Sequence, residues 1–225
     1  MRHFLFLLLL ASFFDQASAA TVTYTQDRRS VWVGGNLSGS KYIYPSTPYA
    51  DMSTVSGYYA PLQNSSLGAD GFTAFGSGDA DYPSSPYGDG WYRSESVFDI
   101  TFSVANGTTM TLSGELFGMN MMYGVGHASI FLYRGDNQLS ENLLYQSIMD
   151  SWGGPQTSAI DYSALLRGGQ YRLIATANPY PQDSHSSYSL TASFTPVPVP
   201  AAAWLLGSGL LGLLGFMKKR KPAMA

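Results

Sequence analysis

The chain has 225 residues, of which 45% are hydrophobic and only 12% charged, with a formal net charge of -3 and no cysteine. This length suits one ordinary domain, and the absence of cysteine excludes disulfide frameworks, thiolate zinc sites, cysteine nucleophiles and the acylated cysteine of bacterial lipoproteins. The weakly acidic total argues against nucleic acid as a partner, because non-specific nucleic-acid binding depends on clustered lysine and arginine.

The N-terminal residues 1–19 have the pattern of a secretory signal peptide. A short basic start is followed by the apolar run FLFLLLLASFF, which ends at Phe14. As a helix, these eleven residues would rise only about 16 Å, too little to span a hydrocarbon layer of roughly 30 Å. The secretion machinery is therefore expected to cleave after Ala19, within the small residues Ala17, Ala19 and Ala20.

Residues 20–195 are predicted to form an exported all-β domain. Apolar and polar residues alternate with the period of a strand in Val97–Val104 and Thr109–Phe117, and Asn106-Gly107 between them indicates a hairpin turn. Further strands are expected at His127–Arg134, Gln170–Ala177 and Ser187–Thr195, whereas Asn142–Met149 fits a helical turn or a strand. Short strands joined by turns favour an antiparallel two-sheet sandwich that is jelly-roll-like.

The segment from Gly34 to Gly90 differs in composition from the rest of the domain. It is rich in Gly, Ser, Pro, Asp and Tyr, and strands are expected only near Tyr42–Tyr44 and Val55–Tyr59. We therefore expect long loops that decorate one end or face of the sandwich, a place where binding sites are common.

Aromatic residues in these loops suggest a carbohydrate-binding module, because flat amphipathic rings stack on the apolar faces of sugars. The alternative is that the rings cover the sandwich and stiffen its loops. The aromatic set comprises Tyr42, Tyr44, Tyr49, Tyr58, Tyr59 and the ligand-loop candidates Tyr82, Tyr87, Trp91 and Tyr92.

Four carboxylates in the same segment form a weak calcium candidate: Asp70, Asp79, Asp81 and Asp89. They lack the spacing of a calcium loop, and Asp beside Gly also makes turns. Residues 20–195 contain seven Lys and Arg against fourteen Asp and Glu, a net charge of -7, so the domain should repel anionic polymers unless divalent cations bridge them. No cofactor is expected, with calcium as the open alternative.

No catalytic constellation is found, so we expect a protein that is not an enzyme. His127 and His185 lie far apart in sequence and lack metal-ligand spacing. His127 is interpreted as a strand-end residue and His185 as part of a loop. The G-x-S-x-G motif of a nucleophile elbow is absent.

Residues 201–217 are predicted to form a transmembrane helix. This run contains no charge and would rise about 26 Å, the short end of the range for a span. The basic tail 218–221 stops transfer and stays cytoplasmic, which places the domain on the other side of the membrane. The tail consists of Lys218, Lys219, Arg220 and Lys221.

A short proline motif, Val197-Pro198-Val199-Pro200-Ala201, stands directly before this helix, and its prolines favour an extended segment. Proline motif, Gly-punctuated helix and basic end together resemble a PEP-CTERM sorting signal of the VPLPA type, with Val199 where that variant carries Leu. The resemblance is limited to residues 196–225. It implies recognition by an exosortase, a membrane-embedded processing enzyme of Gram-negative bacteria that make extracellular polysaccharide.

The sequence thus predicts a non-enzymatic exported protein, sorted to the envelope surface or extracellular polysaccharide. Its precursor would be anchored in the inner membrane, with the mature domain in the periplasm, at the cell surface or in the extracellular matrix. The alternative is a carbohydrate-binding module, and an enzyme acting on polysaccharide ranks below both.

Overall fold

The computed structural model describes residues 22–35, 41–54, 62–81, 92–120, 124–180, 183–197 and 209, and its strands all belong to one compact unit, Ser18–Pro196. The elements in chain order are β1 (Thr23–Asp27), β2 (Ser30–Gly35), β3 (Lys41–Ile43), β4 (Met52–Thr54), β5 (Leu62–Gly68), β6 (Gly71–Asp81), β7 (Tyr92–Val104), β8 (Thr108–Asn120), β9 (Gly126–Arg134), the 3-10 helix η1 (Ser140–Asn142), β10 (Leu143–Ser151), β11 (Gln156–Leu166), β12 (Gly169–Ala177) and β13 (Ser184–Pro196). The predicted all-β class is confirmed.

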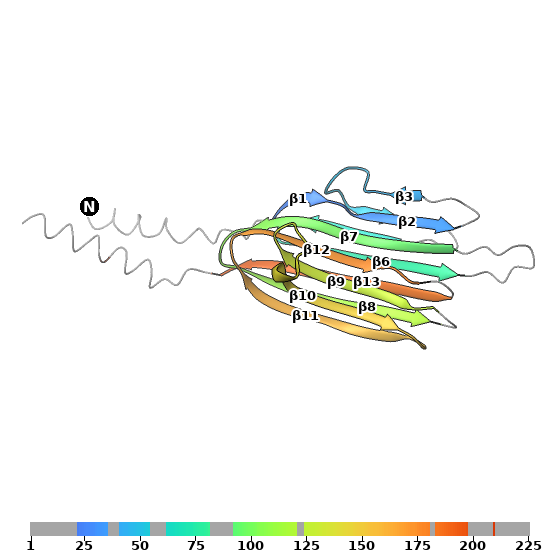
Figure 1. Cartoon of the computed structure of the whole chain (residues 1–225). Coiled ribbons are helices and arrows are strands. Elements are labelled where there is room, and N and C mark those ends of the chain that lie inside the picture. The colour runs from blue at the N-terminus through green and yellow to red at the C-terminus, as the bar shows by residue number, and fades with distance from the viewer. Residues whose placement is uncertain are drawn as a thin grey trace, which may run out of the picture. The chain divides into compact units, whose positions relative to one another are not determined.

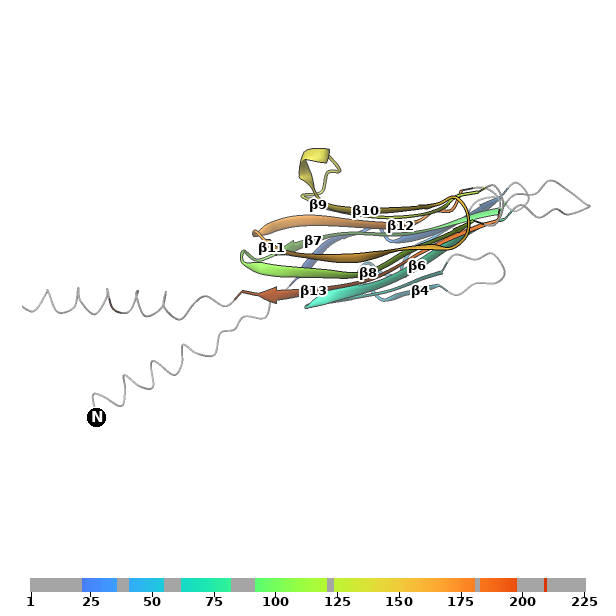
Figure 2. The ribbon, with the colours of Figure 1, turned by 90° about the horizontal axis from the view of Figure 1, so that it is seen from below.

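The strands form an antiparallel β-sandwich whose two layers share one hydrogen-bonded path, β10-β9-β12-β7-β6-β13-β8-β11. The path turns from one layer to the other between β7 and β6, whose described residues pair through Ala80 with Arg93 and Asp81 with Tyr92. The first layer therefore contains β10, β9, β12 and β7, and the second contains β6, β13, β8 and β11 (Figures 1 and 2). The short strands β2 and β3 continue the first layer beyond β7, and β5 and β4 continue the second beyond β6.

Aromatic side chains from both layers meet in the core. Phe98 and Phe102 on β7 pack against Phe72 on β6 and Phe194 on β13, with ring centroids 5.3 Å apart for Phe72–Phe98 and 5.2 Å apart for Phe102–Phe194. Phe98, Phe102 and Phe194 lie on the faces that the alternating pattern placed together, whereas Phe72 lies in a segment that was expected to form loops. All four are 3% exposed or less. The period of two therefore identified the inward faces of β7 and β13 correctly.

A buried ion pair joins the β1–β2 connection to the second layer. Arg29 is fully buried, and its Nη2 lies 2.6 Å from Oδ2 of Asp27, whose side chain is 1% exposed. The same guanidinium donates to Ser65 Oγ on β5 at 2.8 Å and to the Ala50 carbonyl at 2.6 Å. The Tyr49 N–H donates to Asp27 at 2.7 Å, so one pair of charges holds three chain segments together.

The ion pair should make the free energy of unfolding depend on pH in the acid range. Burial alone would raise the pKa of Asp27, but hydrogen bonds from Arg29 and from the Tyr49 N–H outweigh it and hold the pKa below its ordinary value of 3.8. A carboxyl with a lowered folded-state pKa contributes stability above its unfolded pKa, and this contribution disappears as pH falls through the folded pKa. We therefore expect the free energy of unfolding, measured by urea titration, to fall below about pH 4. The Asp27→Asn variant should lack this part of the pH dependence.

Several local predictions need correction. Gly107 has a positive φ of 76°, so a turn forms at Asn106-Gly107, but the expected hairpin is wrong. The turn joins β7 to β8, which lie in different layers and pair with other strands. For Asn142–Met149, the structure combines both alternatives, because η1 ends at Asn142 and β10 begins at Leu143.

The prediction of long loops is wrong for residues 62–81, which form β5, a turn and the whole of β6. His185 likewise lies inside β13 and not in a loop. Tyr42 lies in β3 as predicted, whereas the strand expected at Val55–Tyr59 falls outside the described residues. Within the described part of the chain, no helix is long and apolar enough to cross a membrane, and of the span predicted at 201–217 only Gly209 is described.

Candidate functional site

Exposed aromatic rings gather on the outer face of the first layer. Trp32 on β2 lies beside Tyr42 on β3, with ring centroids 6.5 Å apart, and Tyr42 stacks on Tyr44 at 6.1 Å with an interplanar angle of 11°. Tyr42 and Tyr44 are 58% and 61% exposed. Gly34 provides room for the indole, since a Cβ at this position would lie 2.2 Å from Trp32 Cζ2. These three rings, together with Tyr180, are called the aromatic strip below.

Arg93 on β7 lies between Trp32 and Tyr180 and so connects Tyr180 to the other rings of the aromatic strip. Its guanidinium carbon lies 6.0 Å from the Trp32 ring centroid and 5.3 Å from that of Tyr180, both within cation–π range. Its Nε donates to Asn178 Oδ1 at 3.0 Å, and Nη2 donates to the same oxygen. Tyr180 is 60% exposed and its N–H donates to the Val125 carbonyl at 2.8 Å. Arg93 therefore holds both rings against the same face.

A polar pocket of about 330 Å³ adjoins the aromatic strip. His127 at the start of β9 and Asp150 near the end of β10 occupy paired positions, and Nδ1 of His127 lies 2.5 Å from Oδ1 of Asp150. Since this contact occupies Nδ1, Nε2 is the ring nitrogen left to meet a ligand. The pocket is lined by Arg93, Val125, His127, Asp150, Asn178 and Tyr180.

Glu95 places a further carboxyl close to the polar pocket. It lies on β7 directly opposite Trp32, and burial raises its pKa above the ordinary value of 4.5, against the opposing charges of Arg93 and His127. The site therefore offers rings for stacking beside donors and acceptors for hydrogen bonds. This combination is typical of sites that recognise a ligand with one apolar face and several hydroxyl groups.

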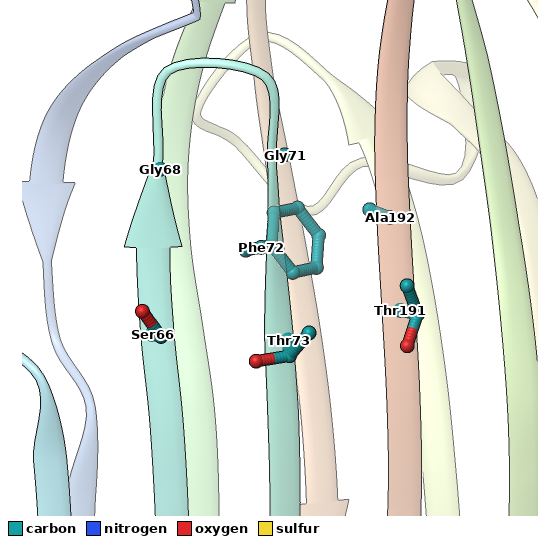
Figure 3. Close-up of a pocket in the computed structure, with 7 residues that line it drawn as sticks. All are labelled: Ser66, Gly68, Gly71, Phe72, Thr73, Thr191 and Ala192. Atoms are coloured by element: carbon teal, nitrogen blue, oxygen red, sulfur yellow. The ribbon is translucent and has the colours of Figure 1, made fainter.

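A second hollow, of about 260 Å³, lies on the second layer. Figure 3 shows it between β5, β6 and β13, where Ser66, Thr73 and Thr191 carry hydroxyl groups. Its lining contains no charged residue and no exposed aromatic ring. It therefore lacks the two features that distinguish the site on the first layer.

The structure separates one calcium candidate, Asp70, from Asp79 and Asp81. Asp70 lies in the turn between β5 and β6, whereas Asp79 lies near the other end of β6, where its Oδ1 is 2.6 Å from His185 Nδ1. Asp81 ends β6 and Asp89 lies outside the described residues. Among the described residues, no group of three or more His, Cys, Asp or Glu is placed to hold a metal ion.

Most other candidates fall outside the described residues, namely Tyr82, Tyr87, Trp91, Ala17, Ala19, Ala20, Pro198, Val199, Pro200, Ala201, Lys218, Lys219, Arg220 and Lys221. Tyr92 begins β7, and Val197 is exposed directly after β13. The sequence identified Tyr42 and Tyr44 but missed Trp32, Arg93, Asn178 and Tyr180, which come from three separate segments. One sequence signal could have pointed to Trp32: it lies in the strand-like run VWV, and this run stands directly before Gly34.

Comparison with known proteins gives only distant likenesses. No protein-family model and no curated protein matches the chain. Among solved structures, it is similar to a chain of the T13 particle of infectious bursal disease virus, at 8% identity and a TM-score of 0.28, over 79% of this chain and 54% of that one. It is also similar to a carbohydrate-binding module from the β-sandwich superfamily, at 11% identity and a TM-score of 0.28, over 80% and 99% of the two chains. The chain thus spans about half the length of the viral chain.

Proposed function

We propose that the domain is a non-enzymatic glycan-binding module carried by an exported, surface-sorted protein. The observation that carries this proposal is the aromatic strip, in which Arg93 contacts the half-buried Trp32 and the exposed Tyr180, and which adjoins the polar pocket. Sugars combine apolar ring faces with hydroxyl groups, and the site offers stacking surfaces and hydrogen-bonding groups side by side. Of the described residues that line the polar pocket, Asp150 is a carboxylate that contacts His127, and Glu95 lies close by on β7.

The fold suits such a role. From β6 to β13, consecutive strands change layer at every step except β9 to β10, which is the order of a jelly roll. We propose the jelly roll as the fold, and this arrangement is found in lectin domains. A rigid sheet holds ring positions more firmly than loops do.

Truncating Trp32 tests the proposed function. We expect Trp32→Ala to weaken binding of the full chain to the extracellular polysaccharide of its own cell by about 30-fold, equivalent to about 2 kcal/mol, because the ring lies at the centre of the aromatic strip. Isothermal titration calorimetry measures the affinity. Phe75→Ala is the matched control, because Phe75 is an exposed ring (37%) on β6 in the other layer. Equal losses in both variants, or no binding by the wild type, would rule out this site.

Delivery to the cell surface is a separate part of the proposal. We propose that residues 1–19 direct export and that residues 196–225 act as a PEP-CTERM-like signal for an exosortase. The support is the sequence pattern of the two ends, together with a compact unit that ends at Pro196. The mature domain would then meet extracellular polysaccharide, the ligand class that the aromatic strip suits.

Deleting residues 196–225 is expected to remove the protein from the surface fraction, as followed by cell fractionation and immunoblotting. Replacing Pro198 and Pro200 by alanine should leave a longer form in the membrane fraction, because the extended segment before the helix is lost. An unchanged surface fraction after the deletion would refute sorting by this segment without affecting the binding proposal.

A further inference from the structure

Six side chains form one row across the strands of the first layer, called the transverse row: Tyr42, Trp32, Glu95, Asn178, His127 and Asp150. Trp32 is the direct cross-strand partner of both Tyr42 and Glu95. His127 is the partner of Asp150, and the Asn178 N–H donates to the His127 carbonyl at 2.9 Å. Asn178 directly follows Ala177, which pairs with Ser96 on β7, so it continues the row next to Glu95.

The transverse row lies on the outer face of the layer. Glu95 alternates along β7 with Ser94 and Ser96, which are fully buried, so its side chain points away from the core. Cross-strand partners share a face, which places Trp32 and Tyr42 beside Glu95. His127 and Asp150 line the polar pocket on the same sheet, close to Asn178.

The row crosses six neighbouring strands, β3-β2-β7-β12-β9-β10. At the spacing of adjacent strands, its two ends are about 24 Å apart. A single sugar ring covers little more than one strand spacing. Only a chain of several sugar units can therefore contact Tyr42 and Asp150 at the same time.

On one side of the transverse row, the neighbouring polar groups already bind one another. Two residues further along the strands lie Val97, Thr176, Ser129 and Ile148, where the Ser129 and Thr176 hydroxyls lie 2.8 Å apart and satisfy each other. Beyond them, Asp99 forms an ion pair with Arg172, whose Nη2 donates to Asp99 Oδ2 at 2.6 Å. On this side of the row, the polar groups of β7, β9 and β12 are therefore engaged with one another. Tyr44, and Arg93 with Tyr180 on the opposite side, widen the site along the strands.

We infer that the outer face of the first layer binds an extended polysaccharide chain laid across the strands along the transverse row, and not a terminal sugar. The Trp32 end supplies stacking surfaces, and the polar pocket at the other end binds hydroxyl groups of units further along the chain. This inference rests on the proposed glycan-binding function and specifies its ligand as an internal stretch of polymer.

Chain length and site variants together test the inference. The polysaccharide is partially hydrolysed and separated into disaccharide and hexasaccharide fractions, and each is titrated against the full chain. We expect the wild type to bind the hexasaccharide at least about 30-fold more tightly than the disaccharide. Trp32→Ala should weaken binding of both fractions, whereas Asp150→Ala should weaken hexasaccharide binding about tenfold and disaccharide binding about twofold or less.

Phe75→Ala is the control for altered surface composition, and thermal unfolding of each variant shows that the fold is retained. If the wild type bound both fractions with equal affinity, binding of a chain along the transverse row would be ruled out, whereas the proposed glycan-binding function would stand. An Asp150→Ala variant with full hexasaccharide affinity would do the same, because the polar pocket would then lie outside the path of the chain. If neither the fractions nor the intact polysaccharide bind, the proposed function itself is wrong.

Discussion

Replacing Arg29 by methionine is expected to lower the free energy of unfolding by about 3–5 kcal/mol. The substitution leaves Asp27 buried and negatively charged without the guanidinium that lies 2.6 Å from it. It also removes the hydrogen bonds to Ser65 Oγ and to the Ala50 carbonyl. The loss of a partner for a buried charge, more than the loss of attraction, accounts for the size of the effect.

Chemical denaturation followed by tryptophan fluorescence measures this loss. Arg167→Met is the matched control, because Arg167 is exposed, and its variant should stay within about 0.5 kcal/mol of the wild type. The double variant Asp27→Leu/Arg29→Met should recover part of the stability, since no isolated charge remains. If Arg29→Met were as mild as the control, the ion pair would not be a structural anchor.

Introducing a side chain at Gly114 is expected to cost about 3 kcal/mol. Gly114 lies within β8, between its partners Leu190 on β13 and Ile160 on β11, and has a φ of 152°. A Cβ there would lie 1.9 Å from the Ser189 carbonyl oxygen, so the backbone of β13 would have to move. Gly114→Ala should therefore unfold at a lower temperature and at a lower denaturant concentration than the wild type.

Gly153→Ala is the control for this substitution. Gly153 lies in the connection between β10 and β11, and a Cβ there meets no atom within 4 Å. Its stability should stay within about 0.5 kcal/mol of the wild type. If Gly114→Ala were as stable as this control, the prediction would be wrong, and the backbone of β13 could shift away from a Cβ without loss of stability.

The strands with regular alternation could be predicted from the sequence. In Ser187–Thr195, the apolar positions Tyr188, Leu190, Ala192 and Phe194 are all buried in the structure. The β5–β6 segment could not be predicted in this way, because its composition resembles that of a loop. Gly76 shows why glycine is used there: a Cβ would lie 2.2 Å from Cζ of Tyr188, whose ring fills that space. Tertiary packing, and not strand propensity, thus determines the residue type.

The Asn106-Gly107 turn shows a second limit of sequence patterns. Its φ preference is local and could be predicted, whereas the pairing of the strands on either side depends on the rest of the chain. The candidate site is subject to the same limit. Tyr42 and Tyr44 were found because they cluster in sequence, but Arg93 and Tyr180 become neighbours only when β7 and the segment after β12 come together.

β13 ends at Pro196, leads directly to Val197, and is paired along both edges. It pairs with β6 from Ser184 to Ser193 and with β8 from Ser184 to Pro196. Hydrogen bonds in antiparallel sheets run perpendicular to the strands. A pull on the C-terminal segment therefore acts along β13 and loads both rows of bonds in shear at once, whereas an edge strand can be peeled away bond by bond. A domain tethered by this end would be mechanically strong under flow or drag on a bound polymer.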